Sequence, residues 1–317
     1  MAAKRSSALV RFVYARCGAK GGEACAALGA RRPTNFSELR AAVQDSWPAI
    51  LGSEGVLPSA LLAPLPDLIQ LADLCGHRQV AVRLPKARLS FLGVRSSFLE
   101  DPKERTFGDV RKGKAPYEDA ELAVLKDVIQ ELTTSQAARR YAASVPLDRD
   151  LPELAALAEP LRSHWAKLLE VLGPEVPNTP VMYLGSGEQR TPLHCDPTEN
   201  ITIVVQGSKL FRLFPPAAAP YLRPLGGWLP AAACWLSGVV PAVYSAADAF
   251  QPLPGPKPLD VQLQAGQGLY LPAGWWHAVV GSQEPNMAIV FGYAPHESKG
   301  ARYFQSWLHP FLGKMAS

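Results

Sequence analysis

The chain has 317 residues, of which 48% are hydrophobic and 19% charged, and its formal net charge is +4. This composition excludes a disordered protein, and the length allows one large domain or two modest ones. The five cysteines are odd in number, widely spaced and without a CxxC pair. This spacing is typical of neither a disulfide framework nor a thiolate zinc site, and it favours a reducing compartment.

The basic excess is a property of the N-terminus alone. Residues 1–22 contain five lysines and arginines and no acidic residue, which leaves 27 basic against 28 acidic side chains in the rest of the chain. This nearly neutral body does not favour nucleic acid as a partner. We expect residues 1–35 to be an extension of an intracellular protein of the cytoplasm or nucleus, or of an organelle if the acid-free opening is a transit peptide.

Between this extension and residue 178 the pattern is mainly helical. Amphipathic helices are predicted by apolar residues that recur every three or four positions in three segments, 36–51, 118–141 and 151–173. Residues 78–84 alternate between apolar and polar side chains, which predicts a strand. We expect these elements, within 36–178, to pack on a core that lies further along the chain.

After residue 179 the pattern changes to short apolar runs bounded by Gly, Pro or Asn, each of which predicts a strand. The runs are VMYLG, NITIVVQG, KLFRLFPP, DVQLQAG, GLYLPAGWWHAVVG and NMAIVFGY. Half a dozen short strands at close spacing predict a mainly β sandwich or barrel of jelly-roll type, with the earlier helices packed outside it. We assign this core to residues 179–297.

Residues 215–258 contain ten of the 30 prolines and interrupt the core, so we expect a long irregular loop there. Within it, residues 224–247 carry no charge and are long enough to cross a bilayer. Pro230, Gly238 and Pro241 would interrupt a spanning helix, and we therefore predict no membrane span.

The last residues, 298–317, are expected to form a C-terminal helix. Residues 301–312 are amphipathic and rich in aromatic side chains, and Phe304, Trp307 and Phe311 would be exposed if nothing covered them. The segment either packs back on its own domain or forms the contact of a homodimer.

A histidine and an aspartate lie two positions apart in TPLHCDPTEN, residues 191–200. On a strand, His194 and Asp196 point to the same face, while Cys195 points to the other. The best candidate for a third ligand is His277 in GLYLPAGWWHAVV. Two histidines and one carboxylate suit the facial triad of a non-haem iron(II) oxygenase, and they also suit a catalytic zinc ion.

A lysine distinguishes these two kinds of metal site. Lys209 lies 15 residues after His194 in the apolar strand SKLFRLF, where an ammonium group is costly to bury without an anionic partner. If it faces the metal, it can bind the carboxylate of an organic acid, which favours an oxygenase over a zinc hydrolase. Thr191, Asn200 and Tyr183 add hydrogen-bonding side chains near the same strand ends.

Together these motifs resemble the JmjC-type, cupin-fold oxygenases that depend on iron(II) and 2-oxoglutarate, in particular the small stand-alone hydroxylases. The resemblance extends from residue 65 to residue 295 and is carried by TPLHCDPTEN, by the lysine after it and by GLYLPAGWWH. It implies a double-stranded β-helix core, in which His194, Asp196 and His277 hold the iron.

The same resemblance assigns the cosubstrate contacts. Lys209 and Thr191 would bind the distal carboxylate of 2-oxoglutarate, and Asn200 would line the cosubstrate pocket. Tyr183 is a further candidate for this pocket. One departure concerns Val290, Phe291 and Gly292, which stand where many of these hydroxylases have Asn-Phe-Trp. The substrate of any one relative therefore does not transfer to this chain.

The resemblance implies a dioxygenase that consumes O2 and 2-oxoglutarate and releases succinate and carbon dioxide. We expect it to hydroxylate a protein side chain held under the loop at 215–258. An N-methyl-lysine demethylase and a tRNA-base hydroxylase are alternatives within the family, but the chain has no zinc-binding cysteine cluster and no basic tract after its first residues. The alternative of another class is a non-catalytic cupin-like binding or scaffold protein.

Overall fold

The computed structural model describes residues 29–52, 55–83, 86–90, 93–97, 120–135, 140–169, 178–187, 189–196, 198–222, 243–245 and 247–293. The acid-free opening, the expected C-terminal helix with its dimer contact, and residues 223–242 of the proline-rich loop lie outside these ranges. Within them, no helix has the length and apolar character that crossing a membrane requires.

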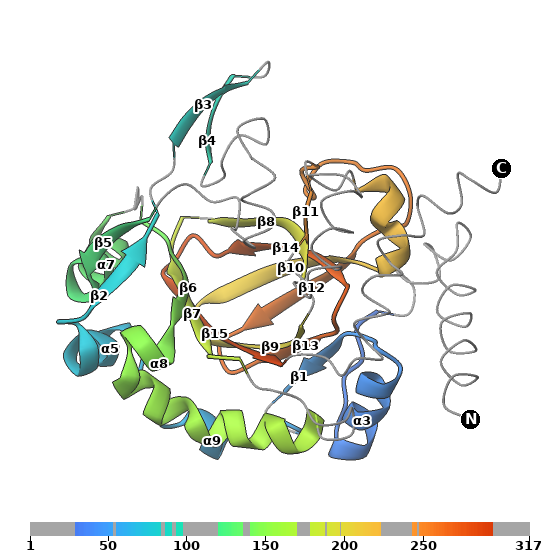
Figure 1. Cartoon of the computed structure of the whole chain (residues 1–317), viewed down its shortest axis with the longest axis horizontal. Coiled ribbons are helices and arrows are strands. Elements are labelled where there is room, and N and C mark those ends of the chain that lie inside the picture. Colours follow the sequence, from blue (N-terminus) through green and yellow to red (C-terminus); the bar gives the residue numbers. More distant parts are fainter. Residues whose placement is uncertain are drawn as a thin grey trace, which may run out of the picture.

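Two antiparallel sheets face each other and enclose the centre of the molecule (Figure 1). The first sheet has the strand order β1(Ala49–Leu51), β13(Gly268–Leu271), β9(Glu199–Gln206), β15(Asn286–Tyr293), β7(Val181–Gly185) and β6(Ala142–Pro146). The second has the order β11(Val243–Tyr244), β8(Arg190–Cys195), β14(Trp276–Gly281), β10(Ser208–Phe214) and β12(Leu259–Gln264). From β7 to β10, and again from β12 to β15, successive strands alternate between the two sheets, and the predicted double-stranded β-helix is therefore confirmed.

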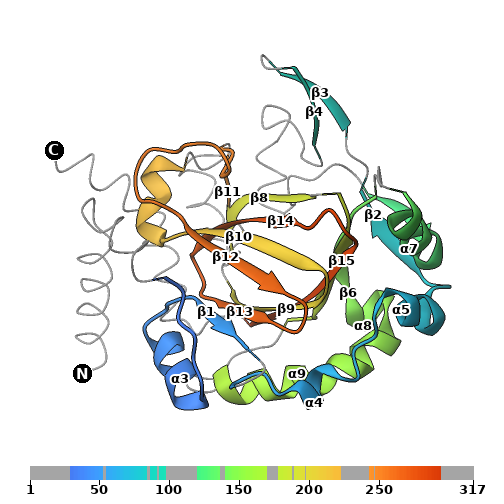
Figure 2. The same ribbon diagram turned by 180° about the vertical axis from the view of Figure 1, so that it is seen from behind.

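Helices cover the outer face of the six-stranded sheet, as Figures 1 and 2 show from opposite sides. They are α3(Phe36–Gln44), α4(Ser59–Leu62), α5(Leu68–Cys75), α7(Leu125–Thr134), α8(Leu147–Asp150) and α9(Pro152–Leu169). Alternate residues of the strands, among them Ile201 and Ile289, share a fully buried cluster with Leu161 and Trp165 of α9. Each such side chain stabilises the fold by about 1.5–3 kcal/mol through removal of apolar surface from water.

The interior between the sheets has an apolar part and a polar part. The apolar part is a cluster of Trp47, Ile50, Val204, Phe211, Leu213, Val261, Leu263, Leu269, Leu271 and Trp275. Buried polar side chains on the core strands include Thr191, His194, Asn200, Thr202, Lys209, His277 and Asn286. Polar groups that are costly to bury thus gather in one place, where their contacts with one another offset the loss of water.

Two of the three predicted helices have different bounds in the structure from those that the sequence predicts. The helix expected over 36–51 ends at Gln44, and after Pro48 the chain pairs as β1 with β13. The helix expected over 118–141 is wrong at its start, because Glu121–Val124 forms β5, which pairs with β2(Gln79–Val82). Pairing with a neighbouring strand outweighs local helical preference there. The helix over 151–173 and the strand over 78–84 are confirmed as α9 and β2.

The described part of the proline-rich loop contains little regular structure. Pro216–Tyr221 forms the 3₁₀ helix η2, and Val243–Tyr244 forms β11 at the edge of the five-stranded sheet. A separate hairpin of β3(Lys86–Ser90) and β4(Gly93–Ser97) stands away from the two main sheets (Figure 1).

Candidate metal and cosubstrate site

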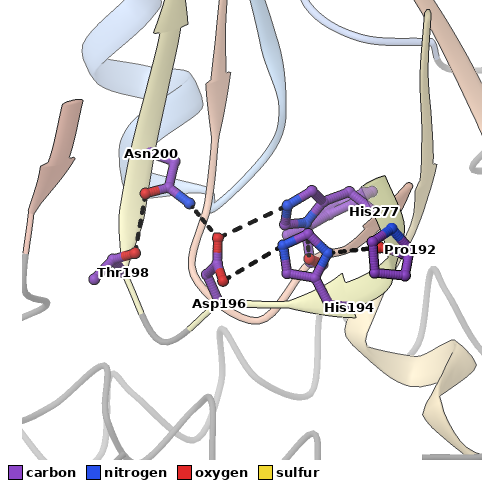
Figure 3. Close-up of polar contacts among 7 residues, drawn as sticks. Pro192, His194, Asp196, Thr198, Asn200 and His277 are labelled. Atoms are coloured by element: carbon purple, nitrogen blue, oxygen red, sulfur yellow. Dashed lines mark hydrogen bonds and ion pairs between the residues drawn. The ribbon is translucent and has the colours of Figure 1, made fainter. Parts of the chain in front are cut away.

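Three predicted metal ligands lie together at the end of β8 and β14 (Figure 3). The two strands pair with His194 opposite His277, so that the centroids of the two rings are 4.0 Å apart. The carboxylate of Asp196 faces both rings, with Oδ1 3.7 Å from His194 Nε2 and Oδ2 3.7 Å from His277 Nε2. One donor atom from each residue lies within 4.8 Å of the others, which is close enough for all three to reach one ion.

Each imidazole is oriented by a backbone carbonyl two residues before it. His194 Nδ1 lies 2.8 Å from the oxygen of Pro192, and His277 Nδ1 lies 3.1 Å from the oxygen of Trp275. A carbonyl oxygen only accepts, so Nδ1 donates in both rings and the neutral ring keeps its lone pair on Nε2, the atom that faces Asp196. Burial, with His194 nearby, lowers the pKa of His277, which favours the neutral ring.

The carboxylate of Asp196 is fixed by a chain of hydrogen bonds from β9 (Figure 3). Asn200 Nδ2 donates to Asp196 Oδ2 at 2.7 Å, and Thr198 Oγ1 donates to Asn200 Oδ1 at 2.9 Å. The structure thus brings Asn200 against the metal-site carboxylate, and its contact with a cosubstrate stays a prediction. Hydrogen-bonded imidazoles and a hydrogen-bonded carboxylate form a donor set that fits a divalent metal ion.

A β-bulge in β8 turns Thr191 to the same face as His194. His277 pairs with His194 but Val279 pairs with Thr191, so two residues of β8 occupy the length of one residue of β14. Without this shift, side chains three positions apart on a strand would point to opposite faces. The bulge therefore brings Thr191 into the interior beside the metal ligands.

Tyr141 lies next to Thr191, and Tyr183 lies next to Tyr141. The hydroxyl of Tyr141 is 3.2 Å from Thr191 Oγ1, and its ring centroid is 6.4 Å from that of Tyr183 on β7. Burial raises the pKa of Tyr141 to about 12, and burial, followed by the proximity of Tyr141 and Asp196, raises that of Tyr183. Both phenols therefore keep their protons at neutral pH. Sequence reasoning missed Tyr141, because the pattern placed it at the end of a helix.

The side chain of Lys209 is only 5% exposed and points inward from β10. Its Nζ donates to Asn286 Oδ1 at 2.5 Å, and burial lowers its pKa to about 8. Among the residues that the structure describes, no acidic side chain forms an ion pair with this ammonium group. Sequence reasoning identified Lys209 and missed its partner, because nothing in the sequence indicates that Asn286 meets it.

The comparison with known proteins begins with curated relatives of low identity. The chain is 28% identical over 197 residues to lysine-specific demethylase JMJ31 of Arabidopsis thaliana, which covers 62% of this chain and 34% of that protein. It is 32% identical over 170 residues to the bifunctional peptidase and (3S)-lysyl hydroxylase JMJD7 of Homo sapiens, which covers 48% of this chain and 53% of that protein. The match thus spans between a third and about half of the length of these relatives.

The model of the cupin-like domain matches residues 77–299, which include every metal and cosubstrate candidate named above. The chain belongs to the cupin-like domain family, in its JmjC type. The resemblance seen in the sequence is therefore confirmed, together with the jelly-roll core that this family shares.

In this JmjC-type cupin, two asparagines lie beside Gly292, one of the three residues that depart from the pattern of many such hydroxylases. Gly292 of β15 pairs with Asn200 of β9, and a Cβ at Gly292 would lie 3.3 Å from Asn178 Nδ2 and 3.4 Å from Asn200 Oδ1. The backbone N–H of Asn178 also donates to the oxygen of Gly292 at 2.8 Å. An asparagine from the chain before β7 thus occupies space beside the metal site.

The proline-rich loop of this JmjC-type cupin packs directly on a metal-ligand strand. Tyr244 of β11 pairs with His194, and the two rings stack with centroids 5.2 Å apart and planes 13° from parallel. The backbone N–H of Ser245 donates to the oxygen of Leu193 at 2.8 Å. Residues 243–245 of the loop therefore lie directly against the strand that carries His194.

Proposed function

We propose that the protein is an iron(II)- and 2-oxoglutarate-dependent dioxygenase that hydroxylates a protein side chain. The observation that carries this proposal is the Lys209 ammonium group, buried in the same barrel as the His194, Asp196 and His277 cluster. The cluster by itself also suits a zinc hydrolase. A buried cation with a neutral partner adds a receptor for the anionic end of an organic acid, which a hydrolase does not need.

In this proposal the two Nε2 atoms and the carboxylate of Asp196 hold the iron on one side. These three protein ligands would leave the metal open to a 2-oxo acid and to O2. Bound iron(II) would supply the activation of O2 that is coupled to loss of carbon dioxide from the 2-oxo acid. Asn200 holds the Asp196 carboxylate in its orientation, and the ring of Tyr244 covers His194 from the loop side.

The far carboxylate of 2-oxoglutarate would meet three donors. The ammonium of Lys209 supplies the charge, and the hydroxyls of Thr191 and Tyr141 supply neutral hydrogen bonds. Both hydroxyls are buried and lie within hydrogen-bonding distance of each other, so they form one polar surface in the barrel. Tyr183 would line the same space. The apolar cluster around Phe211 excludes water from the remaining interior, which strengthens these polar contacts.

The protein substrate is supported by the names of the relatives, which include a lysyl hydroxylase and a lysine-specific demethylase. We favour hydroxylation, because the chain has no zinc-binding cysteine cluster of the kind that accompanies reader modules. Demethylation of an N-methyl-lysine side chain is the second candidate, since a relative bears that name.

The nearly neutral body makes a tRNA substrate less suitable. Cys75 is a free buried thiol, which supports an intracellular location.

The test is formation of succinate from 2-oxoglutarate by purified protein with iron(II) and ascorbate. We expect turnover in the wild type and its loss in His194→Ala and Lys209→Ala. Matched controls are His77→Ala and Lys126→Ala, which remove exposed side chains of the same types. Because some such enzymes turn over only with their prime substrate, calorimetry should also measure metal-dependent binding of 2-oxoglutarate. Absence of both activity and binding would contradict the proposal and favour the scaffold alternative.

A further inference from the structure

The amide of Asn286 is held in one orientation beside Lys209. Its Nδ2 donates to the backbone oxygens of Ser282 at 3.3 Å and Glu284 at 3.2 Å. Both partners only accept, so the amide cannot turn over without losing these two bonds. Oδ1 is therefore the atom that faces Lys209, and it accepts the ammonium hydrogen bond at 2.5 Å. The Asn286 residue is fully buried, so water does not compete for these contacts.

Two glycines make the space that this amide occupies. Gly281 of β14 pairs directly with Lys209 of β10, and a Cβ there would lie 2.6 Å from Asn286 Nδ2 and 2.8 Å from its Oδ1. Gly207 has φ +71°, and its Cβ would lie 2.8 Å from the Cβ of Asn286. Any side chain at either position would displace Asn286. The two glycines therefore leave room for a buried amide beside Lys209.

The chemistry of an amide differs from that of a carboxylate at this place. An amide oxygen fixes the position of the ammonium group but leaves its positive charge uncancelled, whereas an aspartate of nearly the same shape would neutralise it. Burial lowers the pKa of Lys209, whose partner among the described residues is the neutral amide of Asn286. The free protein therefore holds a positioned charge that an incoming anion can neutralise.

We propose that Asn286 is a positioning residue, which fixes the Lys209 ammonium and reserves its charge for the distal carboxylate of a dianionic 2-oxo acid. This inference rests on the proposed function and adds to it the origin of selectivity. A dicarboxylate such as 2-oxoglutarate uses the reserved charge. A monocarboxylate such as 2-oxobutyrate, which binds only through its 2-oxo acid end, does not. Asn286 would thus set the preference between the two classes without touching the metal.

The experiment is calorimetric binding of 2-oxoglutarate and of 2-oxobutyrate to full-length protein loaded with manganese(II) in place of iron(II). In Asn286→Asp, we expect the affinity for 2-oxoglutarate to fall about tenfold or more, while that for 2-oxobutyrate stays within about twofold of wild type. Gln262→Glu is the matched control, because it makes the same change of charge on an exposed residue of the neighbouring strand β12. It should leave both affinities unchanged.

A second variant keeps the test decisive if Asn286→Asp does not fold. Gly281→Ala displaces the Asn286 amide without any change of charge. We expect it to lower the affinity for 2-oxoglutarate about threefold to tenfold and to leave the affinity for 2-oxobutyrate unchanged. Equal losses for the two acids, or unchanged affinity for 2-oxoglutarate in a folded variant, would overturn the role of Asn286. If wild type binds no 2-oxoglutarate with metal present, the proposed function itself fails, and this outcome is distinguishable from the others.

Discussion

His194 and His277 face each other across paired strands, and each ring is held through Nδ1 by the carbonyl oxygen two residues before it. This repeated local arrangement directs both Nε2 atoms to the carboxylate of Asp196. Hydrogen bonds within the protein itself therefore orient the donor atoms toward one another.

Removal of one imidazole should abolish tight metal binding without unfolding the protein. In His277→Ala, we expect the affinity for cobalt(II) or manganese(II) to fall about 100-fold or more, because one of three ligands is lost. The rise in melting temperature that saturating metal gives the wild type should disappear as well. His77→Ala is the control. A metal-induced shift that persists in His277→Ala would show that the ion binds elsewhere.

Replacement of Asn200 separates two roles for this residue. In the structure it holds Asp196, so Asn200→Ala should lower metal affinity about tenfold to 100-fold. Thr198→Ala should have a smaller effect in the same direction, because Thr198 acts only through Asn200. Titration with cobalt(II), followed by its absorption spectrum, measures both. Unchanged metal affinity together with weaker binding of 2-oxoglutarate would instead favour the cosubstrate contact implied by the family resemblance.

The affinity for 2-oxoglutarate should fall as pH rises above about 8, because Lys209 must be protonated to bind the anion. Its folded pKa lies below the ordinary value, so the folded protein binds fewer protons than the unfolded chain between about 8 and 10.5. The contribution of Lys209 to the free energy of unfolding therefore rises with pH in this window, while 2-oxoglutarate affinity falls. Calorimetry from pH 7 to about 9.5 should show the decline in wild type and none in Lys209→Met. A decline of equal size in that variant would assign it to another group.

Loss of the Tyr141 hydroxyl should weaken cosubstrate binding more than folding. Tyr141→Phe removes a partner of Thr191 and should raise the KM for 2-oxoglutarate about threefold to tenfold, with little change in kcat. The free energy of unfolding should fall by about 1 kcal/mol, as for one hydrogen bond. Succinate assays and denaturant unfolding measure the two effects. An unchanged KM would remove Tyr141 from the cosubstrate surface.

Several features of the site follow from local periodicity and can be predicted from the sequence. His194 and Asp196 share a face because side chains on a strand alternate, and this holds wherever the strand lies. Lys209 stands out because a charged residue inside an apolar strand needs a partner. The short runs bounded by glycine and proline predict the core strands, since such residues end strands for reasons of backbone geometry.

Other features depend on which strands meet, and only the tertiary structure decides them. The strand β5 replaces the start of a predicted helix because β2 pairs with it. The bulge opposite Ala278 turns Thr191 toward the interior. The register of β10 with β14 pairs Lys209 with Gly281, next to the amide of Asn286. These contacts join residues that are far apart in the sequence, such as Lys209 and Asn286, which are 77 positions apart. The sequence by itself determined which residues share a face, because side-chain alternation is local; the fold decided which faces meet, because register and bulges depend on long-range packing.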